Sequence, residues 1–436
     1  MDPATLLSVL RSPSGVGMYP AVIQLLYVLT WAVHITFIHL TIGGLFVALY
    51  AAFRRRDPLA QKLARTSVKT AVVGLSLGVV FGVAPLLFTQ VIYDSGWYTA
   101  NTLSAWWVIA FIPVVIAAYY LIYAFYLKAR RAFPAAVPEG ARTKAASPAA
   151  FAEAAATETA GPRTVGGGGI AALFGGLVLV LFAGAIMHIM AYQALFPDRW
   201  IDWYTAGGTT MHTSGLFVYA FNAARYALFV LAALFVYGLY LQAYAWYFAP
   251  RPDADRDALR AFAGTGRRLA AVFGPFAVLA GFAYLALDGL LGRPAVAGAF
   301  LLAVAFGALA VWSTDRDGKT PPRALAFGFL AELALSAFRE ADRFNRYGAF
   351  GHTPYDYPLH LSPYGFFFFL GTFAVGIAFF AFLLRLLFRA GRSADVVTDD
   401  QVAAALGRNW QLSWGLLIAW LIVFWGLGLA VVFFPL

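Results

Sequence analysis

The sequence predicts an all-α fold: a polytopic transmembrane helix bundle of about ten spans (nine to ten), with both termini outside. Its 436 residues are 61% hydrophobic and only 12% charged, and the mean hydropathy is +0.74. Soluble globular domains are not this apolar. In addition, apolar runs of membrane-spanning length recur along the chain, and the loops between them alternate in their content of basic residues.

Each predicted span is a run of about 20 or more mostly apolar residues, the length that crosses the hydrocarbon core of a bilayer. The spans cover residues 20–50, 68–93, 103–127, 168–196, 214–247, 262–288, 294–313, 322–341, 361–388 and 410–434. The first and fifth runs are long enough to tilt or to extend beyond the bilayer. The eighth run is the most polar, because it contains Glu332 and ends at Arg339 and Glu340.

Basic residues follow the odd-numbered spans far more often than the even-numbered ones. The loops after the first, third and fifth spans contain Arg54, Arg55, Arg56, Lys62, Arg65, Lys69, Lys128, Arg130, Arg131, Arg142, Lys144, Arg163, Arg251, Arg256, Arg260, Arg267 and Arg268. By the positive-inside rule such loops are cytoplasmic, which places both termini outside. We therefore expect a multi-pass protein of the inner (cytoplasmic) membrane, in contact with the lipid bilayer. The net charge of +10 reflects this topology and not an affinity for nucleic acid.

The chain is expected to form a single membrane domain over residues 1–436. Residues 132–167, rich in Ala, Pro and Gly, are predicted to be a flexible cytoplasmic loop. Residues 339–363, rich in Tyr, Phe, His and Pro, are predicted to be an outer-face loop. The chain has no cysteine, which excludes disulfides, covalently attached heme and cysteine-ligated iron–sulfur clusters.

Four histidines gather toward one depth of the predicted bilayer. His34 lies in the outer half of the first span, His39 near its middle, His188 about two turns from the outer end of the fourth span, and His212 at the outer start of the fifth. Ionisable residues inside a membrane are costly and usually functional, so these four indicate ligands to the iron of heme b. His34 and His39 point about 140° apart around the helix and cannot face the same iron. The alternative for each histidine is a hydrogen-bonded core residue.

Three more ionisable residues lie inside predicted spans. Arg225, placed about three turns into the fifth span, needs an anionic or polar partner. A heme propionate, a quinone oxygen or Glu332 would suit. Glu332 and Glu340, in the eighth span, are predicted to transfer protons, and structural ion pairs are the alternative. His352 and His360, in the outer-face loop, are expected to be surface residues.

Several motifs resemble subunit I of the cytochrome bd quinol oxidases. Residues 27–43 (YVLTWAVHITFIHLTIG) look like the first helix of that family, and His34 matches a histidine that ligates a heme of the oxygen-reducing site. Residues 77–82 are similar to its second helix. Residues 211–215 (MHTSG) look like the start of its fifth helix, where His212 matches the histidine of the low-spin heme b. Residues 340–343 resemble a Glu-x-x-Arg element whose glutamate binds a heme.

The chain also departs from that family. Residues 101–123 contain no carboxylate where the family has glutamates in its third helix, and the seventh span contains no methionine for the low-spin heme. The loop in which the oxidases bind quinol shrinks to residues 288–294, and His39 stands where the family usually has proline. The resemblance therefore implies a divergent relative that has lost oxygen reduction, with His188 or His39 in place of the missing ligands.

These observations predict a membrane-embedded heme b electron-transfer subunit. It would pass electrons between membrane quinone and a partner redox subunit on the outer face, such as a cytochrome, without reducing oxygen. The alternative is a heme-free, quinone-binding membrane anchor subunit of a respiratory oxidoreductase complex. The missing carboxylates argue against a terminal oxidase, and the absence of clear repeats argues against a transporter.

Overall fold

The computed structural model describes residues 2–132, 166–314, 321–361, 363–392 and 408–433, and within these ranges the regular secondary structure is helical. The α-helices are α1 (Pro3–Leu10), α2 (Pro20–Phe53), α3 (Pro58–Ile92), α4 (Asp94–Leu103), α5 (Ala105–Ala132), α8 (Gly167–Gln193), α9 (Trp200–Thr205), α10 (Ala223–Phe248), α11 (Arg256–Leu287), α12 (Pro294–Trp312), α13 (Pro321–Gly348), α14 (Pro363–Arg392) and α16 (Arg408–Phe433). Three short 3-10 helices, η1 (Pro197–Arg199), η2 (Ala206–Gly208) and η3 (Pro354–Asp356), lie between them. The predicted all-α class is confirmed.

Nine of the described helices are long and apolar enough to cross a membrane: α2, α3, α5, α8, α10, α11, α12, α14 and α16. Even α12, with 19 residues, is about 28 Å long, close to the thickness of the hydrocarbon core. The chain is therefore a polytopic helical membrane protein, as predicted. The proposed cytoplasmic loop at 132–167 lies almost wholly outside the described residues.

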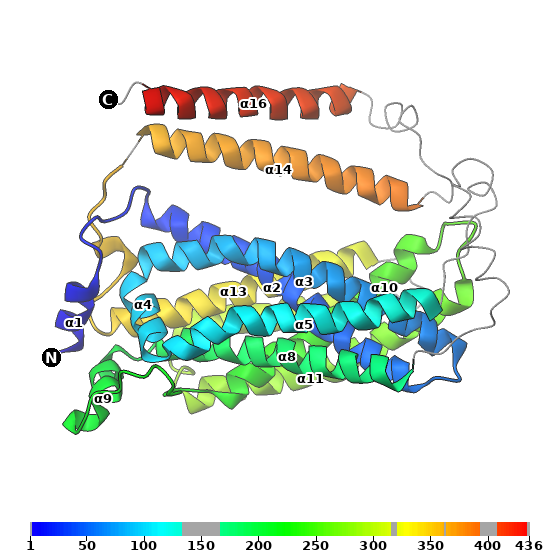
Figure 1. Cartoon of the computed structure of the whole chain (residues 1–436), viewed down its shortest axis with the longest axis horizontal. Coiled ribbons are helices and arrows are strands. Elements are labelled where there is room, and N and C mark those ends of the chain that lie inside the picture. Colours follow the sequence, from blue (N-terminus) through cyan, green and yellow to red (C-terminus); the bar gives the residue numbers. More distant parts are fainter. Residues whose placement is uncertain (1, 133–165, 315–320, 362, 393–407, 434–436) are drawn as a thin grey trace. The chain divides into compact units, whose positions relative to one another are not determined.

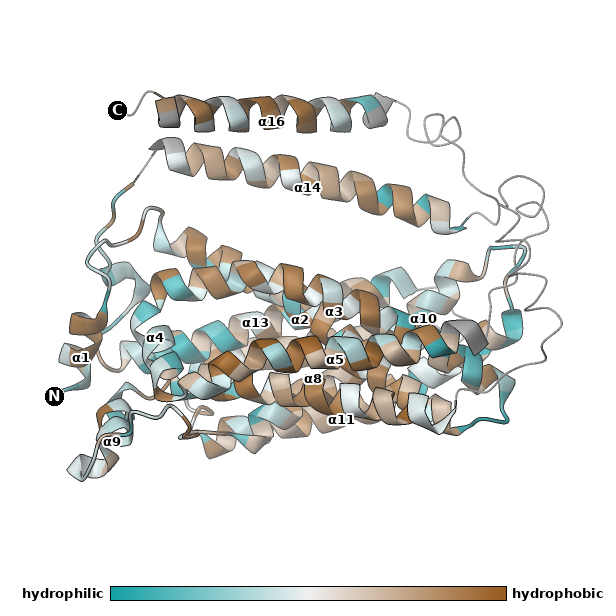
Figure 2. Cartoon of the chain, viewed as in Figure 1, coloured by the Kyte–Doolittle hydropathy of each residue, from teal (hydrophilic) through white to brown (hydrophobic). Residues whose placement is uncertain are grey.

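Helix α13 occupies the place of the eighth predicted span. Its 28 residues give a length of about 42 Å, enough to cross the bilayer, but its charged residues exclude it from the nine apolar helices. Hydrophobic colouring dominates the long helices, whereas hydrophilic residues recur along α13 (Figure 2). The helix continues to Gly348, so residues 339–348, predicted to begin the outer-face loop, are helical instead. The non-helical segment begins at residue 349.

The described chain divides into two compact units. The larger unit contains α1 to α13, apart from the last residues of α10, and the smaller contains α14, α16 and residues 247–254. Within the smaller unit, the Tyr247 hydroxyl donates to the Phe388 carbonyl at 2.7 Å. Within the larger unit, α1, α4 and α9 lie at one end (Figure 1), which we call the α4 end.

The helix starts follow local sequence rules. Proline occupies the first helical position of α2, α3 and α12, where its missing N–H leaves no hydrogen bond unmade. The Asp57 carboxylate caps α3 by accepting from the amides of Leu59 at 3.0 Å and Ala60 at 3.1 Å. Asp255 caps α11 by accepting from the Ala258 amide at 3.0 Å. Such caps satisfy amides that the helix itself cannot pair.

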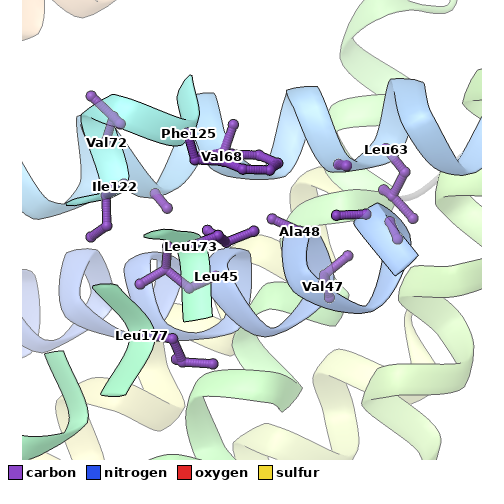
Figure 3. Close-up of a cluster of buried hydrophobic side chains, with 14 of the residues drawn as sticks. Leu45, Val47, Ala48, Leu63, Val68, Val72, Ile122, Phe125, Leu173 and Leu177 are labelled. Carbon is purple, nitrogen blue, oxygen red and sulfur yellow. The ribbon is translucent and has the colours of Figure 1, made fainter. Parts of the chain in front are cut away.

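The main apolar core surrounds the C-terminal half of α2 (Figure 3). Fully buried members from four helices are Leu45, Ala48, Val68, Ile122 and Leu173. Small residues bring the backbones together: a Cβ atom on Gly43 would lie 2.6 Å from the Ala233 carbonyl oxygen of α10. Because lipid gives helices no hydrophobic reason to associate, this close packing holds the bundle together.

The prediction was wrong about the start of the fifth span. Residues 214–222 are not helical, and α10 begins at Ala223. Gly215 has a positive φ of 65°, and side chains from α5 and α8 take up the backbone hydrogen bonds of the segment. The Trp107 indole donates to the Leu216 carbonyl at 2.8 Å, and the Gln193 amide oxygen accepts from the Tyr219 amide at 2.8 Å. Non-helical backbone at membrane depth is tolerated where protein satisfies it in this way.

Candidate functional site

The polar residues of α13 that face the rest of the larger unit form what we call the α13 polar face. Its members are Glu332, Ser336, Arg339, Glu340, Asp342, Arg343 and Arg346. Their spacing of three or four residues places them along one side of the helix. Glu332 and Asp342 are each only 2% exposed. Charges buried at such depth need partners, and the neighbouring helices supply most of them.

His39 and Glu332 form an isolated buried pair. The Nδ1–H of His39 donates to Glu332 Oε1 at 2.7 Å, and both side chains are 2% exposed. His39 Nε2 and Glu332 Oε2 are buried and have no hydrogen-bond partner among the described residues. His39 lies about 28 Å from Pro20 on a helix about 51 Å long, close to its middle. A carboxylate on one ring nitrogen that leaves the other free is the arrangement found behind many metal-bound histidines.

His34 faces α3 rather than α13. Its Nδ1–H donates to the Gly78 carbonyl at 2.8 Å, which leaves Nε2 without a hydrogen bond from the described residues. A Cβ atom on Gly82 would lie 2.8 Å from the His34 Cε1 atom. Glycine at that position therefore lets the imidazole lie directly against the α3 backbone. His34 and His39 thus face different helices, as their spacing predicts.

His188 has a donor opposite each ring nitrogen. Its Nε2 accepts from the Asn222 amide at 3.4 Å, and Arg225 Nη1 lies 3.4 Å from its Nδ1. A neutral imidazole has one N–H and one acceptor nitrogen. If Nε2 accepts, Nδ1 carries the proton and cannot accept from the guanidinium. The contact with Arg225 is therefore not a satisfied hydrogen bond.

His212 lies in the non-helical segment between η2 and α10. Its amide donates to the Tyr204 carbonyl at 2.7 Å, its Nδ1 is 3.0 Å from the Tyr219 hydroxyl, and its ring stacks on Phe217 with centroids 4.1 Å apart. It does not open a helix, contrary to the prediction. No described contact joins it to His34, His39 or His188.

Arg225 lies in the first turn of α10, not three turns into a helix, because the helix starts later than predicted. The Asn222 side chain accepts from the Arg225 amide at 2.9 Å. The guanidinium carbon is 5.6 Å from the Tyr192 ring centroid and 5.9 Å from that of Tyr284. Glu332, one of the partners that the sequence suggested, pairs with His39 instead.

Glu340 connects the buried face to the surface at the α4 end. Its Oε1 accepts from the Tyr93 hydroxyl at 2.6 Å and from the Gln24 amide at 2.8 Å. The Gln24 amide oxygen in turn accepts from the hydroxyl of Tyr355 at 2.8 Å, a residue that is 54% exposed. Arg343 lies 3.6 Å from Glu340 Oε2. Two hydrogen bonds therefore separate a buried carboxylate from the aqueous surface.

The N-terminal segment and the loop after α13 form a closed cap at the α4 end. Asp94 accepts from the Ser12 amide at 2.6 Å and from the Tyr357 hydroxyl at 2.5 Å. Arg11 Nη2 lies 3.3 Å from His352 Nδ1. His352 is only 2% exposed, so the expectation of a surface residue was wrong for it, whereas His360 is exposed. Burial, and then the nearby Arg11 charge, lower the pKa of His352 to about 4.

The sequence missed some members of the site. The Asp288 carboxylate accepts hydrogen bonds from the Tyr192 hydroxyl at 2.9 Å and from the Arg346 guanidinium at 2.5 Å. The Tyr284 hydroxyl donates to Asp342 at 2.5 Å. The signal that could have revealed Asp342 and Arg346 was the regular spacing of charged residues in the eighth span, because this spacing continues past residue 341. It was obscured because that stretch was assigned to a loop.

Among the described residues, no three of His, Cys, Asp and Glu gather as a group that could hold a metal ion. A heme iron needs only one or two protein ligands. Comparison with known protein families found no matching family model, and no curated protein matches the sequence. The fold and the buried polar face define the class of molecule: a polytopic helical membrane protein with ionisable residues in its interior.

Proposed function

We propose that this chain is a heme b electron-transfer subunit of the inner (cytoplasmic) membrane. It passes electrons between membrane quinone and a partner redox subunit, a cytochrome on the outer face, without reducing oxygen. The observation that carries the proposal is the state of His34 and His39 on α2. Each has its Nδ1–H bound to a protein oxygen and its Nε2 free of hydrogen bonds from described residues.

This donor set fits heme b. An anchored Nδ1–H fixes the tautomer and the ring orientation, and it makes Nε2 the more basic, ligating nitrogen. Heme, when bound, supplies a one-electron redox centre whose potential depends on its ligands and on buried charge. Because His34 and His39 face different helices, they would serve separate irons. His188 and His212 complete the predicted set, but each would have to exchange a contact described above to bind iron.

The carboxylates suit proton release that accompanies quinol oxidation. Glu340 accepts from the Gln24 amide, which in turn accepts from the exposed Tyr355 hydroxyl, so a carboxylate able to take up a proton lies close to the surface at the α4 end. Glu332 lies deeper and shares a hydrogen bond with His39. We assign the α4 end to the outer face, in agreement with the charge distribution of the loops.

The resemblance to cytochrome bd subunit I supports the same proposal. The Glu340–Arg343 element, which resembles the family's heme-binding glutamate and arginine, forms a buried pair. His34, which resembles the family's heme histidine, has a free Nε2. The chain would then be a divergent relative that has kept heme sites on α2 and α13. It would have lost oxygen chemistry, because residues 101–123 lack the carboxylates of the family's third helix.

A reduced-minus-oxidised spectrum of the purified protein, with a pyridine hemochromogen assay and carbon monoxide addition, tests this function. We expect a b-type heme spectrum that carbon monoxide does not shift. A carbon monoxide-binding, chlorin-type heme would indicate a terminal oxidase instead. Absence of heme in protein produced with an adequate heme supply would contradict the proposal.

A heme-free quinone-binding anchor subunit is the second candidate. The observation that favours it is the polar group formed by His188, Asn222 and Arg225 at the start of α10, in which the Arg225 guanidinium meets only a 3.4 Å contact with His188 Nδ1; that guanidinium would suit a quinone oxygen. In that case purified protein would contain extractable quinone and no heme. Asn222→Ala and Arg225→Gln would then lower the quinone content, while the exposed-residue change His360→Ala would leave it unchanged.

A further inference from the structure

Glu340 and Arg343, one turn apart on α13, each have a buried polar atom without a hydrogen bond. These atoms are Glu340 Oε2 and Arg343 Nη1, and neither has a hydrogen-bond partner among the described residues. The two side chains are only 9% and 7% exposed, respectively. In a low-dielectric interior, an unpaired acceptor and an unpaired donor on charged groups are costly. The two atoms therefore point to a partner that is not part of the chain.

The distance between the two atoms restricts what that partner is. Glu340 Oε2 and Arg343 Nη1 are 3.6 Å apart, which is too far for a hydrogen bond between them. One oxygen atom about 2.8 Å from each would bridge them. This oxygen must donate a hydrogen to the carboxylate and accept one from the guanidinium. A hydroxyl group does both, whereas a carbonyl oxygen can only accept.

The neighbouring polar atoms of the pair are already occupied. Glu340 Oε1 accepts from the Tyr93 hydroxyl at 2.6 Å and from the Gln24 amide at 2.8 Å. Arg343 Nη2 donates to the Tyr27 hydroxyl at 3.2 Å. The Arg343 guanidinium carbon lies 5.0 Å from the Tyr27 ring centroid and 4.7 Å from that of Tyr93. These contacts fix both charged groups and place aromatic rings against the guanidinium, which suits a ligand with a flat apolar body.

The site lies near the surface at the α4 end. Gln24 is about one turn from the start of α2, and Glu340 is about two turns from the end of α13. Gln24 is partly exposed, and its amide oxygen accepts from the hydroxyl of the exposed Tyr355. Movement of these two side chains, which one hydrogen bond joins, would open the site. A ligand with a polar head group and an apolar tail finds both of its preferred surroundings at such a depth.

We propose that Glu340 and Arg343 bind one hydroxyl of a membrane quinol, and that the site favours quinol over quinone. The identity of the ligand rests on the proposed function, which requires quinone but does not locate a site for it. A quinol hydroxyl donates to Glu340 Oε2 and accepts from Arg343 Nη1, so both free atoms are satisfied. A quinone carbonyl accepts from Arg343 but brings a second acceptor oxygen against the Glu340 carboxylate.

Two other occupants would use the site differently. A heme iron ligated by Glu340 Oε2 would leave the Arg343 N–H unpaired, so it satisfies one of the two atoms where a hydroxyl satisfies both. A water molecule has the same hydroxyl chemistry as quinol. Water alone would leave the chain without any preference between the two forms of quinone. Both occupants are outcomes that the experiment separates from quinol.

Calorimetric titration of the detergent-solubilised chain with decylubiquinol, kept reduced under argon, and with decylubiquinone tests the site. The wild type should bind the quinol about tenfold more tightly than the quinone, because it gains a hydrogen bond to a charged group. Glu340→Gln should abolish this preference, since an amide presents either a donor or an acceptor to the bound oxygen. Arg343→Met should weaken the binding of both forms by about tenfold, because it removes the donor that both use.

Asp257 and Arg260 provide matched controls, because they form an exposed ion pair with the same spacing of three residues. Asp257→Asn and Arg260→Met should leave both affinities unchanged. If a variant at Glu340 or Arg343 fails to fold, the preference of the wild type for quinol still decides the question. Equal affinities of the wild type for the two forms, or binding of neither, would overturn the quinol site and leave water as its occupant.

Failure of the proposed function is distinguishable from failure of this site, because quinol binding is measured without reference to heme. A chain without heme that prefers quinol through Glu340 would refute the heme function and support the site. A chain with heme but without a preference for quinol would overturn the site alone. Loss of heme from Glu340→Gln with unchanged quinol binding would make Glu340 an iron ligand and overturn the site. Quinol binding that is lost in Arg225→Gln and unchanged in Glu340→Gln would place the ligand at the start of α10 instead.

Discussion

The two halves of α2 lie in different surroundings. From Ile42 to Ala52 the helix packs into an apolar core with α3, α5 and α8 (Figure 3). From Gln24 to His39 it contacts the α13 polar face through hydrogen bonds and a cation–π contact. One helix therefore contributes stability at one end and ionisable chemistry at the other. Substitutions in the apolar C-terminal half should change folding. Substitutions in the polar N-terminal half should change binding and redox behaviour more than folding.

The largest effect is expected from truncation of the apolar half. Leu45→Ala, at a side chain that is fully buried, should lower the free energy of unfolding by about 3 kcal/mol, because it leaves a cavity. Leu25→Ala on the same helix is the control, since Leu25 is 67% exposed. Thermal unfolding followed by fluorescence-detected size exclusion measures both. Equal melting temperatures for the two variants would contradict the comparison.

Close helix packing gives a prediction in which two similar changes act in opposite directions. Gly43→Ala should destabilise the protein by about 2 kcal/mol, because its Cβ would lie 2.6 Å from the Ala233 carbonyl oxygen. Gly264→Ala, where nothing lies within 4 Å, should stabilise α11 by about 0.5–1 kcal/mol. Chemical denaturation of the purified variants gives both values. A Gly43→Ala protein at least as stable as the wild type would show that α2 and α10 are not in tight contact there.

The polar half predicts a difference between two changes at one residue. Glu332→Leu removes the acceptor of the His39 Nδ1–H and should cost about 2 kcal/mol. Glu332→Gln keeps an acceptor in place and should cost less than about 1 kcal/mol. Both variants should alter the absorbance or potential of any heme held by His39. Variants that match the wild type in stability and spectrum would mean that the buried pair has neither role.

The cap at the α4 end predicts a smaller, pH-dependent effect. Because the pKa of His352 is lowered to about 4 in the folded chain, below an unfolded value of about 6.5, its neutral form stabilises the fold. That stability is complete above about pH 6.5 and is lost as the pH falls toward 4, at up to about 1.4 kcal/mol per pH unit. Melting temperatures at pH 7 and pH 5 should differ more for the wild type than for His352→Gln. An identical pH dependence would show that His352 does not titrate with unfolding.

Hydrophobicity alone could predict the fold class and the places of the ten long helices, because membrane spans are set by length and apolarity. It did not predict the short helices α1, α4 and α9. Hydropathy did not show that residues 214–222 are non-helical, since Trp107 and Gln193, far away in sequence, satisfy their backbone groups. It also could not place the end of α13. The run from Arg339 to Arg346 is as polar as a surface loop, and its helical structure is understandable only once its partners on α2 and α11 are known.

The candidate site was predictable by residue type but not by pairing. Histidines and carboxylates in apolar runs were detectable, and His39 and Glu332 were both singled out from the sequence. Their contact joins residues 293 positions apart, which no local pattern could reveal.

The central claim is that α2 holds heme iron through His34 and His39, and heme content per chain tests it most directly. A pyridine hemochromogen assay on the wild type, His34→Ala, His39→Ala and the exposed control His360→Ala should show b-type heme in the first and the last. Each α2 variant should lose part of it, because the two histidines face different helices. Full heme content in both α2 variants, or none in the wild type, would contradict the account.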